Sequence, residues 1–187
     1  CLQYTYEFHT TYGQPILTCP TIPPIDRCQL RISLLREELK ELESAIDKLD
    51  IVEVADALAD IQYVLSGTVH EFGMGKCFGK LLKEVHSSNM SKTCKTKQKV
   101  DQTVEKYTRE GKETYIQEVG GLYVVKKADD NKVLKGVDFR EPRLRNILEL
   151  PIDCKSDNTD PCMPALIPLY SNFGSDPLGQ DPSSSPL

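Results

Sequence analysis

Residues 31–72 read RISLLREELKELESAIDKLDIVEVADALADIQYVLSGTVHEF, and this stretch decides the fold of the chain. Apolar residues recur three and four positions apart on both sides of the polar segment 47–50, which predicts two helices joined by a short turn. The two expected apolar stripes are Leu35, Leu39, Leu42, Ile46 and Leu49, then Val54, Leu58, Ile61, Leu65, Val69 and Phe72. The pattern favours an antiparallel helical hairpin with these stripes in its core.

Both predicted helices also carry clustered acidic residues. The first has Glu37, Glu38 and Glu41, and the second has Glu53, Asp56 and Asp60. Residues three and four positions apart share a helix face, so each set forms an acidic ridge. The positions four residues after the second set hold alanine, aspartate and valine, so no cation of that helix offsets the ridge. Ala57, Tyr63, Val64 and Gly67 accompany these acids, and we therefore expect a partly buried carboxylate layer.

Buried carboxylates must be paired, protonated or bound to a metal ion. In a folded-back hairpin the two acidic sets face one gap. Ligands that are all oxygen and highly charged suit Mg²⁺ or Mn²⁺ better than zinc. The candidate metal ligands are Glu38, Glu41, Glu53, Asp56 and Asp60. The alternative is a solvated helix face rich in acids, which suits Glu37 and Glu43 beside Lys40.

The acidic residues fall into two motifs, EExxE at 37–41 and ExxD at 53–56. These motifs resemble the signature of the all-α nucleoside triphosphate pyrophosphatases, which include MazG-like proteins, dimeric dUTPases and phosphoribosyl-ATP pyrophosphatases. FHTTYGQP, ADALADIQYVLSGT, EVHSSNMSK and KVLKG resemble one MazG-like or phosphoribosyl-ATP pyrophosphatase-like branch. The resemblance covers roughly residues 8–148. Eleven residues separate Glu41 from Glu53, which is short for the signature and concerns the turn between the helices.

The resemblance implies a mainly α fold, an oligomeric helical bundle, and Mg²⁺ bound at the acidic motifs. It implies hydrolysis of a nucleoside triphosphate between its α and β phosphates, with Glu37 or Glu38 as the candidate catalytic base for a metal-bound water. The candidate substrate-binding residues are His9, Arg27, Tyr63, His86, Asn89, Lys92 and Lys135. Two alternatives stay open: a phosphoribosyl-ATP pyrophosphatase of histidine biosynthesis, and a non-catalytic helical assembly module whose acids hold a structural Ca²⁺ or Mg²⁺.

Three of these candidates follow one another at the end of a predicted helix. His86, Asn89 and Lys92 stand three positions apart, close to one helix face. They offer an imidazole, an amide and a cation, which suit contacts to a base, a ribose and a phosphate. An ordinary polar last turn of a helix would also use such residues.

The remaining elements are predicted from local signals. Residues 2–12 fit a helix or a strand, and the family resemblance favours the helix. Residues 13–26 hold four prolines and form a connector that ends with Asp26 as a helix cap. Glycines at 73 and 75 end the second long helix, and a helix follows at 76–89 with Phe78, Leu81, Leu82 and Val85 inward. A helix at 99–109 precedes a β-hairpin that turns at Gly120 and Gly121.

These elements suggest a division of the chain. We expect a helical core at 1–92, an inserted α+β lobe at 93–131 that is either a lid or a decoration, and a return segment at 132–150. A flexible tail rich in Pro, Ser and Asp is expected at 151–187.

Composition excludes several classes of function. The net charge of −5 argues against a nucleic-acid partner, and no apolar run is long enough to span a membrane. Seven scattered cysteines without a CxxC pair predict reduced thiols in a cytoplasmic protein, and we see no secretory signal in residues that start at Cys1 rather than Met. Helices with apolar residues on both sides predict a homodimer or homotetramer.

Overall fold

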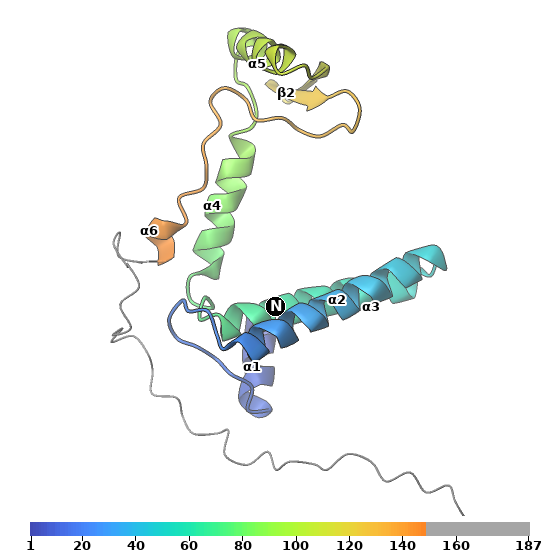
Figure 1. The fold of residues 1–187 in the computed structure, drawn as a ribbon, viewed down its shortest axis with the longest axis vertical. Coiled ribbons are helices and arrows are strands. Elements are labelled where there is room, and N and C mark those ends of the chain that lie inside the picture. Colours follow the sequence, from blue (N-terminus) through green and yellow to red (C-terminus); the bar gives the residue numbers. More distant parts are fainter. Residues whose placement is uncertain (149–187) are drawn as a thin grey trace, which may run out of the picture. The chain divides into compact units, whose positions relative to one another are not determined.

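The structure is a computed structural model and describes residues 1–148. It is mainly helical, with a long helix pair and a two-stranded hairpin packed beside a helix (Figure 1), which confirms the predicted fold class. The elements are α1 (Leu2–Thr11), α2 (Ile25–Asp47), α3 (Ile51–Glu71), α4 (Phe78–Met90), α5 (Lys97–Arg109), β1 (Thr114–Val119), β2 (Leu122–Lys127) and α6 (Arg145–Leu148). The predicted tail at 151–187 lies outside the described residues. Within residues 1–148 no helix is long and apolar enough to cross a membrane.

The long helix pair is the predicted antiparallel hairpin. α2 and α3 run side by side (Figure 1), and α1 packs against α3. The chain reverses where Leu49 adopts a positive φ of 55°. The Asp50 carboxylate then accepts hydrogen bonds from the backbone nitrogens of Val52 and Glu53, which caps α3. At the other end of α3, Gly73 has a φ of 69°, so the predicted glycine stop is confirmed.

The start of α2 differs from the prediction. The residue that caps this helix is Pro24, whose fixed φ of −49° leads the chain into the helix, and it makes no side-chain capping bond. Asp26 lies inside the first turn, so the prediction that it is the cap was wrong. Its charge there still interacts favourably with the helix dipole.

The predicted apolar stripes are buried only in part. Val69 is buried as predicted, and five other members of the stripes are half-buried: Leu35, Leu42, Val54, Ile61 and Phe72. Ala45 on α2 and Ala57 on α3 are buried, as is Gly67 further along α3. Small residues allow two helices to approach closely, so this face forms the contact. Several predicted core residues are instead exposed: Leu39, Ile46, Leu49, Leu58 and Leu65, with Leu49 at 90%. Those core assignments were wrong for the single chain, since nothing within residues 1–148 covers them.

α4 follows the prediction in part. The helix runs two residues later than expected at its start and one residue later at its end. Leu81 is buried as predicted, whereas Leu82 is 60% exposed and does not point inward. The last turn carries Ser88, whose buried hydroxyl donates to the backbone oxygen of Arg140 at 2.9 Å. This bond attaches the segment after the hairpin to α4.

The hairpin forms as predicted. β1 and β2 pair antiparallel with Val119 opposite Leu122, which leaves Gly120 and Gly121 as a two-residue turn. Both glycines have positive φ, 57° and 75°, as a type I′ turn requires. β2 packs against α5 through an apolar cluster of Cys94, Val100, Tyr107, Val125 and Leu134. Leu134 belongs to the predicted return segment, and the division at 131/132 stays a prediction.

Candidate active site

Glu38 lies at the centre of the acidic site on the helix pair. Its side chain is half-buried on the side of α2 that faces α3. Burial raises the pKa of the Glu38 carboxyl above its ordinary value of 4.5, and neighbouring negative charges raise that pKa further. These charges belong to Asp60, Glu41, Glu37 and Asp56, in order of decreasing effect. Acids of both helices therefore act on one carboxyl group, as the sequence predicted.

Four of the other predicted acids are more exposed than expected: Glu41, Glu53, Asp56 and Asp60. Glu37 is exposed as well, in agreement with the solvated face expected around Lys40. The predicted partly buried layer of Glu53, Asp56 and Asp60 was therefore wrong, and of the acids in the two motifs only Glu38 is half-buried. The physical reason is the one that exposes part of the apolar stripes: no element within residues 1–148 covers this side of the helix pair.

The donor chemistry of this cluster fits Mg²⁺ or Mn²⁺, because all its ligand atoms are carboxylate oxygens. The side chains do not form a closed cage. Within residues 1–148, no three His, Cys, Asp or Glu side chains converge closely enough to hold a metal ion. The acids share one electrostatic environment, but in this single chain they are not gathered around one point.

A buried ionic network lies at the opposite end of the same helix pair. Glu71, whose side chain has no exposed surface, accepts two hydrogen bonds from Arg27, at 3.0 Å from Nε and 2.6 Å from Nη2. Arg31 Nε lies 3.5 Å from the same carboxylate. Arg27 also donates to Gln14 Oε1 at 3.2 Å. The Arg27 guanidinium is therefore engaged within the protein, and its predicted contact to a phosphate stays a prediction.

His9 is buried beside this network. Its Nδ1 lies 2.9 Å from the backbone oxygen of Pro15, and its ring is 6.0 Å from that of His70. Burial is the main cause that lowers the pKa of His9 below 6.5, and the positive charge of Arg31 lowers it as well. His9 is therefore neutral at pH 7 and only 2% exposed. Its role in substrate binding remains a prediction.

Tyr63 is partly exposed on α3. Its ring meets Phe8 of α1 edge-on, at 5.7 Å between ring centroids. This places it where α1 crosses α3, and its predicted contact with substrate stays a prediction.

The structure joins the two segments that carry the predicted lysines. The backbone nitrogen of Gly136 donates to the backbone oxygen of Lys92 at 3.0 Å, so the chain segments that carry Lys92 and Lys135 lie next to each other. A Cβ on Gly136 would lie 2.8 Å from that oxygen, so the approach requires glycine. Lys135 Nζ lies 2.7 Å from Glu141 and 4.3 Å from the centre of the Phe139 ring. On α4, His86 and Asn89 are exposed.

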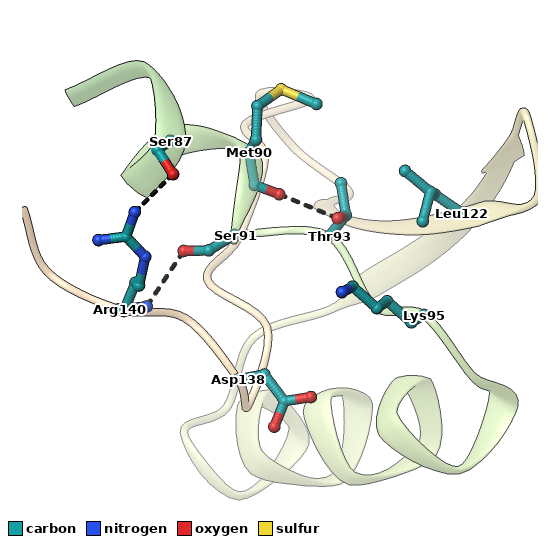
Figure 2. Close-up of a pocket in the computed structure, with 8 residues that line it drawn as sticks. All are labelled: Ser87, Met90, Ser91, Thr93, Lys95, Leu122, Asp138 and Arg140. Carbon is teal, nitrogen blue, oxygen red and sulfur yellow. Dashed lines mark hydrogen bonds between the residues drawn. The ribbon is translucent and has the colours of Figure 1, made fainter. Parts of the chain in front are cut away.

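A cavity of about 430 Å³ lies beside the end of α4 and contains none of the predicted site residues. Its lining consists of Ser87, Met90, Ser91, Thr93, Lys95, Leu122, Asp138 and Arg140. Figure 2 shows Arg140 reaching Ser87 with its guanidinium and Ser91 with its backbone nitrogen. Arg140 also bonds Glu84 at 2.6 Å. Sequence analysis missed this cavity, although Ser87 in the last turn of α4 and Ser91, which caps the end of that helix, stand four positions apart.

The sequence analysis also missed Glu71 and Arg31. One signal was present: Arg27 and Arg31 stand four positions apart on α2, and an acid ends α3. In a hairpin joined by a short turn, the start of the first helix meets the end of the second. That geometry would have brought the three charges together.

Residues 5–89 match the family model of phosphoribosyl-ATP pyrophosphohydrolase. This part of the chain, which includes α2, α3 and the acidic cluster, is therefore a domain of that family and of the all-α nucleoside triphosphate pyrophosphatase superfamily. The matched residues end within α4, before α5 and the hairpin. The resemblance carried by the acidic motifs is thus confirmed.

A relative with a similar segment is an uncharacterized protein of Acanthamoeba polyphaga mimivirus. It is 35% identical over 77 residues, which make up 39% of this chain and 28% of the mimivirus protein. The chain therefore spans well under half the length of this relative.

Proposed function

We propose that the chain hydrolyses a nucleoside triphosphate to the nucleoside monophosphate and pyrophosphate, with Mg²⁺ or Mn²⁺ as cofactor. The observation that supports this most directly is Glu38, a half-buried carboxyl under the influence of acids from both helices of a pyrophosphohydrolase-family domain. The repulsion between these carboxylates destabilises the protein when no cation is bound, and a bound cation offsets that repulsion.

The acids are given the roles that the EExxE and ExxD motifs imply. Glu38, Glu41, Glu53 and Asp56 would hold the metal, with Asp60 beside them. A bound divalent ion would lower the pKa of water and offset charge on the phosphates. Glu37 or Glu38 would accept the proton from the attacking water.

The exposed apolar side of the helix pair is the part of the site that the single chain leaves open. Leu39, Leu58 and Leu65 all lie on α2 and α3 with a third or more of their surface accessible. A homodimer or homotetramer would cover such residues and exclude water from the acids. The predicted oligomer is part of this proposal.

The test is a panel of ribo- and deoxyribonucleoside triphosphates incubated with purified protein and Mg²⁺. Pyrophosphate release from at least one of them supports the proposal. The matched variant is Glu41→Gln, which should lower turnover by about 100-fold or more if the carboxylate holds the metal. Folded protein that releases no pyrophosphate from any substrate, and a Glu41→Gln variant that changes only stability, would point to a non-catalytic helical module instead.

A second candidate is phosphoribosyl-ATP pyrophosphatase, which is favoured by the description of the matching family. It would use the same acids and break the same kind of bond. Turnover of phosphoribosyl-ATP and of the nucleoside triphosphates by one preparation, compared through kcat/KM, separates the two candidates.

A further inference from the structure

The ionic network at the end of the helix pair crosses from α2 to α3 and is almost sealed from water. The side chain of Glu71 is 0% exposed and those of Arg27 and Arg31 are 16% and 10% exposed. The two hydrogen bonds between Arg27 and Glu71 use both carboxylate oxygens, so their geometry is directional. We call Arg27, Arg31 and Glu71 the Glu71 clamp.

Arg31 fixes the clamp across the backbone of α3. Its Nη2 donates to the backbone oxygen of Val64 at 3.1 Å, and its Nε lies 3.2 Å from Thr68 Oγ1. A Cβ on Gly67 would lie only 2.0 Å from Arg31 Nη2, so the guanidinium lies against a helix surface that has no side chain there. Arg31 therefore fits against α3 at this one position.

The clamp and the acidic cluster share one alignment of the two helices. In an antiparallel pair, a step forward on α2 corresponds to an equal step back on α3. Glu38 lies eleven residues after Arg27, and Asp60 lies eleven residues before Glu71. The alignment that pairs Arg27 with Glu71 is therefore the one that places Glu38 opposite Asp60.

The rest of the interface cannot specify this alignment by itself. Between the contact of the clamp with Val64 and the turn, the buried residues are the two small apolar residues Ala45 and Ala57, and apolar contacts are non-directional. The turn after Asp47 joins the helices at one end only. At the other end, about 16 Å along α2 from Glu38 at 1.5 Å per residue, the clamp holds them together.

We propose that Glu71 is a positioning residue for the acidic cluster: by binding Arg27 and Arg31 it aligns α2 with α3 and keeps Glu38 opposite Asp60, the two acids around which a shared cation site would be built. This inference rests on the proposed function, since the cation is the one that the pyrophosphohydrolase would use. Glu71 lies well outside the metal-binding motifs and acts through helix alignment.

The test is calorimetric titration of the full chain with Mg²⁺ alone, without nucleotide, so that contacts of Arg27 with a substrate do not enter. Glu71→Gln removes the charge at constant size, and Glu71→Asp keeps the charge but shortens the reach, which safeguards the test if the first variant does not fold. The matched control is Val69→Ala, which weakens the same end of α3 through a buried apolar residue and leaves the clamp intact. Thermal unfolding measures the stability of each variant.

We expect Mg²⁺ affinity to fall about 10-fold or more in Glu71→Gln and by a smaller factor in Glu71→Asp, because small displacements of ligand groups have large effects. Val69→Ala should lower the melting temperature without changing Mg²⁺ affinity. Unchanged affinity in both Glu71 variants, or a loss in Val69→Ala that matches its loss of stability, would overturn the inference. Native protein that binds Mg²⁺ through a Glu71-dependent site but releases no pyrophosphate would overturn the proposed function and support the clamp. Native protein that binds no Mg²⁺ would overturn both.

Discussion

The hydroxyl of Tyr107 makes two hydrogen bonds to one residue, Lys135: it donates to the backbone oxygen and accepts from the backbone nitrogen, both at 3.1 Å. Tyr107 is buried in the cluster between α5 and β2, so α5 holds the backbone of the KVLKG segment. Tyr107→Phe leaves both backbone groups without this partner. We expect the free energy of opening of this region to fall by about 1–3 kcal/mol, measured by hydrogen exchange of the β2 amides.

Tyr115→Phe is the control for this prediction. The hydroxyl of Tyr115 bonds Asn131 Oδ1 at 2.9 Å, and both side chains are exposed. Water replaces such a bond, so the variant should change the same opening free energy by less than about 1 kcal/mol. Equal losses of opening free energy in the two variants would show that the bonds to Lys135 stabilise this region no more than an exposed hydrogen bond does.

Gly67→Ala tests the close approach between Arg31 and α3. The added Cβ would lie 2.0 Å from Arg31 Nη2 and 2.7 Å from His9 Nε2, so one of two buried side chains must move. We expect a loss of about 1–3 kcal/mol in the free energy of unfolding, measured by urea denaturation followed by circular dichroism.

Gly79→Ala provides the opposite expectation within the same chain. Gly79 is an exposed residue of α4, and a Cβ there meets no atom within 4 Å. Alanine favours a helix over glycine by up to about 1 kcal/mol, so this variant should be slightly more stable than the native chain. A stabilising Gly67→Ala would mean that Arg31 and His9 are less tightly held than the structure indicates.

The stability of the chain should depend on pH through His9. Burial lowers the pKa of His9 below 6.5, so the folded protein binds this proton more weakly than the unfolded chain does. The unfolded chain therefore takes up the proton first as the pH falls through 6.5, and the free energy of unfolding decreases below that value. Above it, the contribution of His9 is fully present.

Melting temperatures of the native chain and of His9→Gln, recorded as the pH is lowered from neutrality, would measure this dependence. Glutamine does not titrate, so the variant should lose less stability on acidification, although it starts less stable because the bond to Pro15 changes. Parallel pH profiles for the two proteins would assign the acid sensitivity to other groups.

Glu38→Gln should separate stability from activity. Burial and the nearby acids raise the pKa of Glu38 above 4.5, so its negative charge costs free energy in the folded protein at neutral pH. A neutral glutamine removes that cost, and we expect a higher melting temperature at pH 7 in the absence of metal. The difference should shrink as the pH falls through the pKa of Glu38, because the native carboxyl becomes neutral too. Pyrophosphate release should be lost, and an active Glu38→Gln would contradict the assigned role.

The parts of the structure with strong local signals could be predicted from the sequence. Helical spacing identified α2 and α3, glycines marked the end of α3, and Gly120 with Gly121 defined the hairpin and its register. The acidic motifs and the segments around them identified the family of residues 5–89. Each of these signals lies within a few adjacent residues or within one helix.

The features that were not predicted depend on which helix faces meet. The spacing of Leu39, Ile46 and Leu58 identifies an apolar side of each helix but not the surface that covers it. In the structure these three side chains are exposed, whereas Ala45, Ala57 and Gly67 are buried. The bond between Arg27 and Glu71 joins residues 44 positions apart, and no local pattern specifies it. The exposure of the predicted carboxylate layer follows from the same choice of face.

The hydrogen bond between Gly136 and Lys92 has a consequence for the history of the chain. This bond brings residue 136 back to residue 92. The segment between them, which contains α5, β1 and β2, is therefore an insertion whose two ends lie next to each other. A gene could gain or lose those residues without altering the distance that the flanking parts must bridge. Natural variants that differ by this whole segment are therefore compatible with one unchanged helical part, α1 to α4.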